Sequence, residues 1–403
     1  MKSTRRSRSK NSNRVISSVN LKKFLDSKPL YYDSIDYEFF PKIWTKYKHK
    51  LKTKAKVVHI VGTNGKGTTG KTISTYLSRT NYKVGHFSSP FLYKWCDIWT
   101  INNQLIDDDV LKKAHKFLQG LLNRDEIKHI SRFEYSTLMC FKLFEFMDFV
   151  VLEAGLGGEK DATNVHKKYL SVFVCIGFDH TEFLGKTVNK IATTKLNSMD
   201  KNMIIGCQKY DEVIKIATNI AKQKNTKYHN LSILTNKEKQ KIQKYFSVLP
   251  KFLIQNISLA VAATKLLGMD IKISNLKNLK FEARFEQIND NIIIDVGHNS
   301  LSAMAIKDFI KQGTILIYNC LYDKNFKVIL DILKPKIKMV YILNIKDKRV
   351  VNINTLKKEI TSLGMGVDLF ENNTLKKENN YLVYGSFVVV RTFMKGKYWK
   401  KMI

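Results

Sequence analysis

A glycine-rich segment is the clearest candidate for chemistry in the sequence. It reads GTNGKGTT over residues 62–69 and follows the β-branched run 57–61 directly. Glycines let backbone N–H groups approach phosphate oxygens, and the start of a helix adds a favourable dipole. Lys66 would supply a positive charge for β- and γ-phosphates, and Thr68 a hydroxyl near a metal ion. The strict pattern GxxxxGK[ST] is not met, because position 60 is not glycine and a further glycine follows the lysine. We predict a phosphate-binding loop here, with a structural turn as the alternative.

The elements that must hold this loop alternate between short apolar runs and longer helical stretches from about Leu21 onward. Continuous apolar runs are typical of strands buried on both faces of a parallel sheet. Helical connections between such strands indicate a doubly wound α/β fold, which binds ligands at the carboxyl ends of its strands. The strands predicted in this way span residues 57–61, 149–152, 172–176, 292–295, 314–318, 340–343 and 381–390.

Length and cysteine content narrow the class of protein. A chain of 403 residues is long for one core, so two domains are expected. No apolar stretch approaches the roughly 18 residues that a membrane-spanning helix needs, so no membrane partner is predicted. The five cysteines are scattered, without a CxxC pair. This pattern argues against a disulfide framework or a structural zinc site and favours a reducing, cytoplasmic setting.

The net charge is the most unusual bulk property. Lys and Arg total 69 against 35 acidic residues, for a formal charge of +34. Such a charge would attract polyanions, and a nucleic-acid partner is one interpretation. The basic residues run through the whole chain, however, and no RRM, KH or helix-turn-helix signature occurs. We therefore favour a general enrichment in lysine and predict no dedicated nucleic-acid partner.

The first twenty residues differ from the rest of the chain. Arg and Lys are interleaved with Ser and Asn, and no acidic residue occurs before Asp26. The apolar region of a secretory signal is missing. Organelle targeting and a polyanion-binding arm stay open as functions, but we favour a basic, disordered extension over residues 1–20.

Four ordered motifs resemble the folylpolyglutamate synthase/dihydrofolate synthase family of the Mur-ligase superfamily. The loop at 62–69 matches the form G-T-N-G-K-G-[ST], and VGHFSSP at 84–90 is similar to the family's second strand. VLEAGLGGEKDATNV at 151–165 is similar to the signature E-x-G-L-G-G-x-x-D-A-T-N-V. IGFDHTEFLG at 176–185 is close to I-G-x-D-H-x-x-x-L-G. Further matches lie at Arg284, 295–299, 323–324 and 385–386.

The resemblance covers all but about the first twenty residues and implies a two-domain enzyme. A P-loop-containing Mur-ligase-type ATPase domain is expected over residues 21–281, and a smaller Rossmann-like α/β domain over 282–403. In the family's reaction, ATP phosphorylates a carboxylate and the amine of glutamate then displaces phosphate. Catalytic roles are implied for Lys66, Lys195 and His298. The implied contacts with ATP are Gly62, Thr63, Asn64, Gly65, Lys66, Gly67, Thr68, Asn256, Arg284 and Asp295.

The resemblance also implies two magnesium ions. Ser89, Glu153 and His180 would hold the ion that bridges the β- and γ-phosphates, and their predicted positions beyond strand ends favour a site. Taken one at a time, each has a more common role: Ser89 as a turn residue, Glu153 in an ion pair and His180 as a hydrogen-bonded core histidine. Lys195, in the segment IATTK at 191–195, would carry a carbamate and bind a second ion. An ordinary surface lysine is the alternative, because the flanking residues depart from the family's pattern.

Two segments depart further from the family. Asn256 matches the asparagine that reads adenine, and we expect it to open a helix over 256–263. The His-Gln pair expected before it is replaced by Phe252 and Leu253. The RFNERI-like segment of relatives is KWCDIW at 94–99, where Lys for Arg is not conservative if a bidentate contact is needed. This loop lies beside the pterin-side substrate in relatives, so its change bears mainly on substrate choice.

We therefore predict an ATP-dependent ligase that adds L-glutamate to dihydropteroate, to reduced folates, or to both. It would act as a monomer on these small molecules, with ATP and Mg²⁺. One alternative is a related Mur-type ligase for another carboxylate, although no extra N-terminal domain for a UDP-sugar substrate is evident. The other is a basic ATP-binding protein with a polyanion partner.

Overall fold

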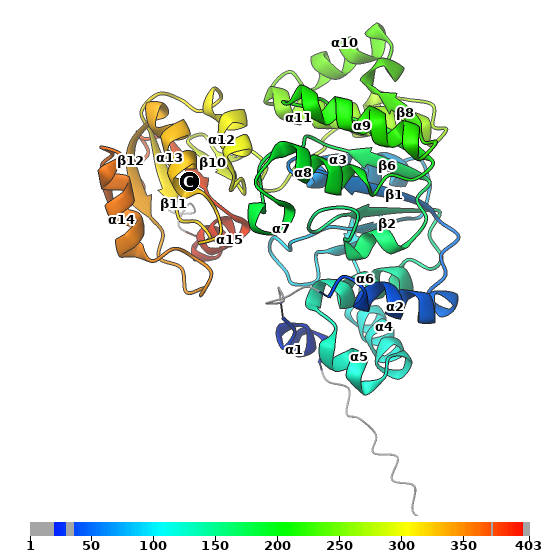
Figure 1. Ribbon diagram of the computed structural model, residues 1–403. Helices are drawn as coiled ribbons and strands as arrows, with labels where there is room; N and C mark the ends of the chain where they lie inside the picture. The colour runs from blue at the N-terminus through cyan, green and yellow to red at the C-terminus, as the bar shows by residue number, and fades with distance from the viewer. Residues whose placement is uncertain (1–19, 30–35, 372–373, 398–403) are drawn as a thin grey trace, which may run out of the picture.

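The computed structural model describes residues 20–29, 36–371 and 374–397, which form two neighbouring α/β lobes (Figure 1). An eight-stranded sheet organises the first lobe and a six-stranded sheet the second. The extension predicted over residues 1–20 lies outside the described residues, except for Asn20, which caps the first helix. Within the described ranges, no helix has the combined length and apolar character needed to cross a bilayer.

The first sheet has the strand order β4-β3-β2-β5-β1-β6-β7-β8. Its six central and distal strands are parallel, whereas β3 and β4 form an antiparallel edge. The prediction of a parallel sheet misses this edge, because both strands are too short to give an apolar run and β4 is also exposed. The strands are β1 (Lys56–Val61), β2 (Val84–Phe87), β3 (Trp99–Ile101), β4 (Gln104–Leu105), β5 (Phe149–Glu153), β6 (Leu170–Phe173), β7 (Asn202–Ile205) and β8 (Lys227–Asn230).

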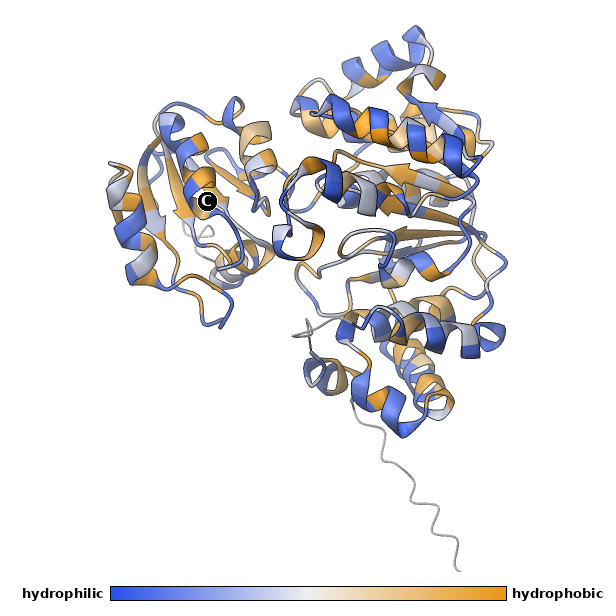
Figure 2. Ribbon diagram, in the orientation of Figure 1, coloured by the Kyte–Doolittle hydropathy of each residue, from blue (hydrophilic) through white to orange (hydrophobic). Residues whose placement is uncertain are grey.

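Helices cover both faces of this sheet, because successive side chains of β1 are buried in cores on opposite faces. Val58 and Ile60 pack in one core with α3 and α11, while Val57 and Val61 belong to separate cores on the opposite face. Figure 2 shows apolar strands inside and hydrophilic outer helix faces. The helices are α1 (Leu21–Asp26), α2 (Phe39–Tyr47), α3 (Lys66–Ser78), α4 (Asp108–Leu121), α5 (Arg124–His129), α6 (Arg132–Leu143), α7 (Thr181–Leu184), α8 (Val188–Leu196), α9 (Asp211–Gln223), α10 (Asn236–Tyr245) and α11 (Lys251–Leu266).

The second sheet has the order β13-β12-β11-β14-β10-β9, parallel except for β9. Helices α12–α14 pack against one face and α15 against the other. The elements are β9 (Glu286–Asn289), β10 (Ile292–Asp295), α12 (Ser300–Lys307), β11 (Thr314–Tyr318), α13 (Phe326–Leu333), β12 (Ile337–Ile342), α14 (Ile353–Ser362), β13 (Val367–Leu369), β14 (Tyr381–Tyr384) and α15 (Phe387–Gly396).

The long strand predicted over residues 381–390 is wrong in its second half. β14 ends at Tyr384, and α15 begins at Phe387. Gly385 has a φ of +128°, which breaks the strand, and the Ser386 hydroxyl accepts a hydrogen bond from the Val389 N–H to start the helix. The apolar run misleads because residues beyond the turn are also buried, as helical residues in the core beside β10 and β14.

The core to which the chain belongs changes between residues 281 and 283. Phe281 still packs in the core of the first lobe, whereas Ala283 packs in that of the second. We therefore keep residues 281 and 282 as the proposed domain boundary.

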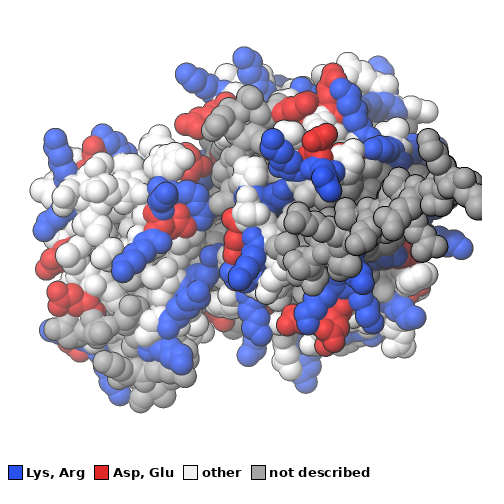
Figure 3. Space-filling model, turned by 90° about the horizontal axis from the view of Figure 1, so that it is seen from below, with Lys and Arg blue, Asp and Glu red and all other residues white. Residues whose placement is uncertain are grey.

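The surface seen from below carries its basic side chains widely spread, with acidic ones among them (Figure 3). They do not gather into one continuous stripe on this face. This distribution fits the general lysine enrichment better than a nucleic-acid groove.

Gly385→Ala should strongly destabilise the second lobe. A Cβ at this position would lie 1.9 Å from the carbonyl oxygen of Asn319, on a backbone that L side chains rarely adopt. We expect a loss of roughly 2–4 kcal/mol in the free energy of unfolding, measured by urea denaturation. Gly120→Ala is the matched control, because nothing lies within 4 Å of its added Cβ in α4. It should stabilise slightly, by up to about 1 kcal/mol. Equal effects of the two variants would contradict this account.

Candidate active site

The phosphate loop lies, as predicted, between β1 and α3. Gly65 has a φ of +103° immediately before Lys66, the first residue of α3. The backbone N–H groups of Thr63 and Asn64 donate to the carbonyl oxygen of Cys175, at 2.9 and 3.2 Å. This contact explains why β6 ends at Phe173 rather than at the predicted residue 176: the chain beyond it supports the loop.

Two lysines meet at the carbonyl oxygen of Gly62. Lys66 Nζ donates to it at 3.0 Å and to Thr63 O at 3.2 Å, and Lys195 Nζ donates to it at 3.1 Å. Lys195 lies on α8 with only 4% of its surface exposed, so the surface-lysine alternative is wrong. Burial, and next the charge of Lys66, lowers the pKa of Lys195 to about 7. Burial also lowers the pKa of Lys66, although nearby carboxylates oppose the shift.

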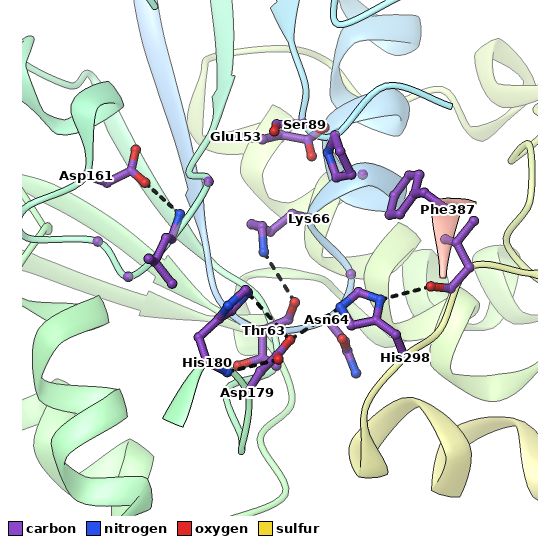
Figure 4. A pocket seen from close by; sticks show the side chains of 18 of the residues that line it. Thr63, Asn64, Lys66, Ser89, Glu153, Asp161, Asp179, His180, His298 and Phe387 are labelled. Carbon is purple, nitrogen blue, oxygen red and sulfur yellow. Dashed lines mark hydrogen bonds and ion pairs between the residues drawn. The ribbon is translucent and has the colours of Figure 1, made fainter. Parts of the chain in front are cut away.

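Ser89 and Glu153 lie together on one side of Lys66 (Figure 4). Glu153 is the last residue of β5 and is 2% exposed, and Ser89 follows the end of β2. Glu153 Oε1 accepts a hydrogen bond from Nε2 of His86, at 2.8 Å. The sheet thus brings to one edge two side chains that are 64 residues apart in the sequence.

Asp179 and His180 lie on the other side of Lys66 (Figure 4). His180 has a φ of +50° and precedes α7. Burial lowers the pKa of its imidazole to about 3, although Asp179 opposes the shift. The imidazole is therefore neutral near pH 7, the form that can bind a metal ion.

Asp179 joins the two lobes. Its Oδ1 accepts from Lys324 Nζ at 2.8 Å, and its Oδ2 accepts from Asn299 Nδ2 at 3.1 Å. The His298 ring lies 3.5 Å from Oδ2. Burial alone would raise the pKa of Asp179, but His298, His180 and Lys324 hold it well below its usual range. The carboxylate therefore stays charged beside the ammonium group of Lys324.

A second contact ties the second lobe to the phosphate loop itself. Asn64 Nδ2 donates to Asn299 Oδ1 at 2.9 Å, and Asn299 Nδ2 donates to Asn64 Oδ1 at 3.0 Å. Asn299 also caps α12 by accepting from the Ser302 N–H. The side chain of Asn64, predicted to contact ATP, thus makes an interdomain amide pair in this structure.

The remaining predicted residues of the second lobe face the same cavity. His298 Nδ1 donates to Val296 O at 3.0 Å, which leaves Nε2 on the side of Asp179. The Arg284 guanidinium stacks on the Phe387 ring at 5.0 Å and lies close to Gly67. Asp295 accepts from the backbone N–H groups of Phe285 and Gly297, at 2.7 and 2.6 Å.

Asn256 does not open a helix, so that expectation is wrong. α11 begins at Lys251, after Pro250, and places Asn256 in its second turn. Its side chain lies against Gly65, where an added Cβ would come within 2.4 Å of the amide oxygen. Phe252, Gln255 and Asn256 all line the cavity on this side.

One cavity of about 1630 Å³ extends from the phosphate loop to an aromatic region of the first lobe. Phe40, Trp44 and Phe133 line that region. The loop at 90–98, which includes most of the segment that differs from the family's pattern, lies along the cavity. It contacts the second lobe, where Arg391 donates to the carbonyl oxygens of Phe91 and Leu92 at 2.8 Å each. Asp97 braces the loop by accepting from backbone N–H groups within it.

The donor set suits a magnesium ion that shares its coordination with phosphates and water. Ser89 and Glu153 offer hard oxygen atoms, and His180 a neutral nitrogen. Among the described residues, no three His, Cys, Asp or Glu side chains form a ready-made cage. Magnesium rarely uses such a cage and usually takes one or two protein ligands beside the phosphates of a substrate.

The sequence motifs assign no role to three residues that make important contacts: Asp179, Asn299 and His86. Asp179 and Asn299 stand beside predicted site residues, so adjacency is the signal that points to them. His86 lies within an apolar strand, and only its contact with Glu153 reveals it.

No protein-family model matches the chain. The dihydrofolate synthase/folylpolyglutamate synthase of Buchnera aphidicola subsp. Baizongia pistaciae is 30% identical over 370 residues, covering 84% of this chain and 86% of that protein. The crystal structure of Helicobacter pylori folylpolyglutamate synthetase shares 38% identity with a TM-score of 0.73, covering 94% of this chain and 98% of that one. E. coli FolC in complex with DHPP and ADP has a TM-score of 0.78 at 22% identity, covering 94% and 97%.

The two lobes and the loop between β1 and α3 define a two-domain α/β ligase of the Mur-ligase type, which confirms the predicted fold class. The chain belongs to the dihydrofolate synthase/folylpolyglutamate synthase family. It is an ATP-dependent ligase that attaches glutamate, as the sequence motifs predict.

Asp179→Asn should loosen the junction between the lobes. The change removes the charge opposite Lys324, and these two side chains are 8% and 5% exposed. Breaking a buried pair costs about 3 kcal/mol or more, measured as the free energy of unfolding at pH 7. Glu38→Gln is the control, since its pair with Lys42 is exposed and should change stability by less than about 0.5 kcal/mol.

The same comparison has a defined pH dependence. The folded pKa of Asp179 lies well below the ordinary value of 3.8, so its stabilisation is present above that value and is lost as pH falls through the folded pKa. The difference between wild type and Asp179→Asn should therefore shrink below about pH 4. A difference that is constant from pH 7 to pH 3 would contradict the ion-pair account.

Proposed function

We propose that this enzyme adds L-glutamate to dihydropteroate, to reduced folates, or to both, through an acyl-phosphate intermediate. The observation that carries the proposal is the single cavity shared by the phosphate loop, His298 of the second lobe and the aromatic region of the first. Related structures support the ligands: FolC of E. coli is described in complex with DHPP and ADP, and the Yersinia pestis enzyme with Mn, AMPPNP and L-glutamate bound. Small molecules are the partners, and we propose that the enzyme acts as a monomer.

In the first step, an oxygen of the pteroate or folate carboxylate attacks the γ-phosphorus of ATP and ADP leaves. Negative charge spreads over the phosphoryl oxygens, so fixed cations stabilise the transition state. Lys66 and Arg284 are the cations beside the loop, and we assign them to the phosphates. The loop from Gly62 to Thr68 would surround the phosphates with N–H groups, and Asn256, with Asp295 of the second lobe, would contact the nucleotide.

Ser89, Glu153 and His180 would hold a magnesium ion beside these phosphates. Such an ion supplies charge neutralisation as the phosphoryl group transfers. The chain's contribution is to keep oxygen donors on one side of Lys66 and an imidazole nitrogen on the other (Figure 4).

Lys195 would carry a carbamate that holds a second ion. A carbamate forms only from an uncharged amine, and a pKa of about 7 makes that form abundant at neutral pH. Addition of CO₂ replaces a buried cation with an anion, which removes the repulsion from Lys66.

In the second step, the glutamate amine attacks the acyl carbon and phosphate leaves. His298 is the residue that we place beside the incoming glutamate, because its Nε2 faces the junction between the lobes. The acceptor specificity would depend on the loop at 90–98, which the second lobe holds through Arg391. Closure of the lobes would thus complete both substrate sites together.

Phosphate release is the direct test of the reaction. We expect it to require ATP and glutamate together with dihydropteroate or tetrahydrofolate, and not to respond to a muropeptide precursor. Lys66→Ala should lower kcat on the order of 10²-fold or more, since it removes one clamp on the transferring group. Its melting temperature should change little. Phosphate release that ignores both pterin substrates would overturn the proposal, and normal turnover of Lys66→Ala would overturn the ATP site.

The carbamate gives a separate prediction. Activity should fall in CO₂-depleted buffer and return with bicarbonate. Lys195→Ala should lose activity and recover part of it with a short-chain carboxylate that occupies the vacated position. If wild type ignores CO₂ and Lys195→Ala is fully active, Lys195 has no such role.

A further inference from the structure

His86 is a buried histidine behind the phosphate site. It lies in β2, is 6% exposed, and pairs in register with Val151 of the adjacent parallel strand β5. Glu153 is two residues further along β5 and therefore points to the same face of the sheet. Glu153 is one of the described residues that line the cavity, and His86 is not. The imidazole can thus act on the site only through the carboxylate.

The two oxygens of Glu153 have different surroundings. Oε1 accepts the hydrogen bond from His86 Nε2, at 2.8 Å. Oε2 faces the start of α3, where it lies 3.8 Å from the position of a Cβ on Gly67. That same position is 3.1 Å from Arg284 Nη2. One oxygen is therefore fixed from behind, and the other is directed at the phosphate loop.

Gly70 of α3 provides the space for this pair. A Cβ at residue 70 would lie 2.7 Å from His86 Nε2 and 2.9 Å from Glu153 Oε1. No side chain larger than glycine fits over the hydrogen bond without moving one partner. The helix that carries the phosphate loop is thus packed directly on the His86–Glu153 contact.

We propose that His86 is a positioning residue that holds Glu153 with its second oxygen directed at the metal and phosphates. The inference rests on the proposed function, because it needs Glu153 to be a metal ligand. A buried carboxylate with one oxygen bound can rotate less, so its other oxygen meets an incoming cation at a smaller entropic cost. Hydrogen-bond partners of this kind typically change metal affinity by 10- to 100-fold.

The test measures Mn²⁺ binding to the full-length protein in the presence of ADP, from the electron paramagnetic resonance of free Mn²⁺. His86→Leu removes the donor at similar size and should weaken Mn²⁺ affinity at least 10-fold. ADP affinity without metal should change less than about 2-fold, because the phosphate loop is untouched. His86→Gln restores an N–H donor at the position of Nε2 and should recover affinity to within about 3-fold of wild type.

Two further variants separate positioning from general packing. His115→Leu removes another buried imidazole, which bonds the Tyr135 hydroxyl at 2.7 Å between α4 and α6, and should leave Mn²⁺ affinity unchanged. Gly70→Ala should weaken Mn²⁺ affinity at least 5-fold by displacing the pair, although alanine is the better helix former.

The outcomes are distinct. Wild-type Mn²⁺ affinity in His86→Leu or in Gly70→Ala would overturn the positioning role while the proposed ligase function stands. Equal losses in His86→Leu and His115→Leu would also overturn it. If wild type forms no complex with Mn²⁺ and ADP, the proposed metal site itself fails, and the inference fails with it.

Discussion

The buried carboxylate of Asp179 is the contact on which the arrangement of the two lobes depends. A charge removed from water is costly unless partners compensate it, and most of the partners of Asp179 come from the second lobe. Lys324 and Asn299 make these contacts where the second lobe faces the phosphate loop. The same placement sets Asn299 against Asn64 and brings His298 to the cavity. The charge of one side chain in the first lobe thus helps to fix where Asn299 and His298 of the second lobe lie.

Three basic side chains lie close together at the phosphate loop. Lys66 and Lys195 share one carbonyl oxygen, Arg284 lies across the loop, and burial lowers the pKa of each of the three side chains. Such a cluster is unfavourable without anions, because each buried cation has lost water and repels the others. A polyphosphate at the loop would add negative charge to that of the carboxylates already near these cations. The concentration of positive charge thus favours the binding of an anionic ligand, and the carbamate that we propose on Lys195 would reduce that charge further.

Much of the fold follows from local pattern. Six of the seven predicted apolar runs match a strand to within a few residues at both ends, since strands buried on both faces leave a continuous apolar signal. The run at 381–390 fails because burial is the same for a strand and for the helix that follows it, and only Gly385 marks the change. The start of α11 is missed for a related reason. Pro250 is its N-cap residue, six positions before Asn256, and a motif match gives no helix boundary. The short antiparallel edge gives no apolar run at all.

The sequence by itself determined the phosphate loop, the motifs that carry Glu153 and His180, the family and the α/β class. These are properties of neighbouring residues, so spacing along the chain is enough to reveal them. The tertiary structure decided the burial of Lys195, the partners of Asp179, the pairing of Asn64 with Asn299 and the support of Glu153 by His86. Each of these contacts joins residues between 67 and 235 positions apart. Their energies depend on desolvation and on which strands lie next to each other, and neither quantity exists until the chain has folded.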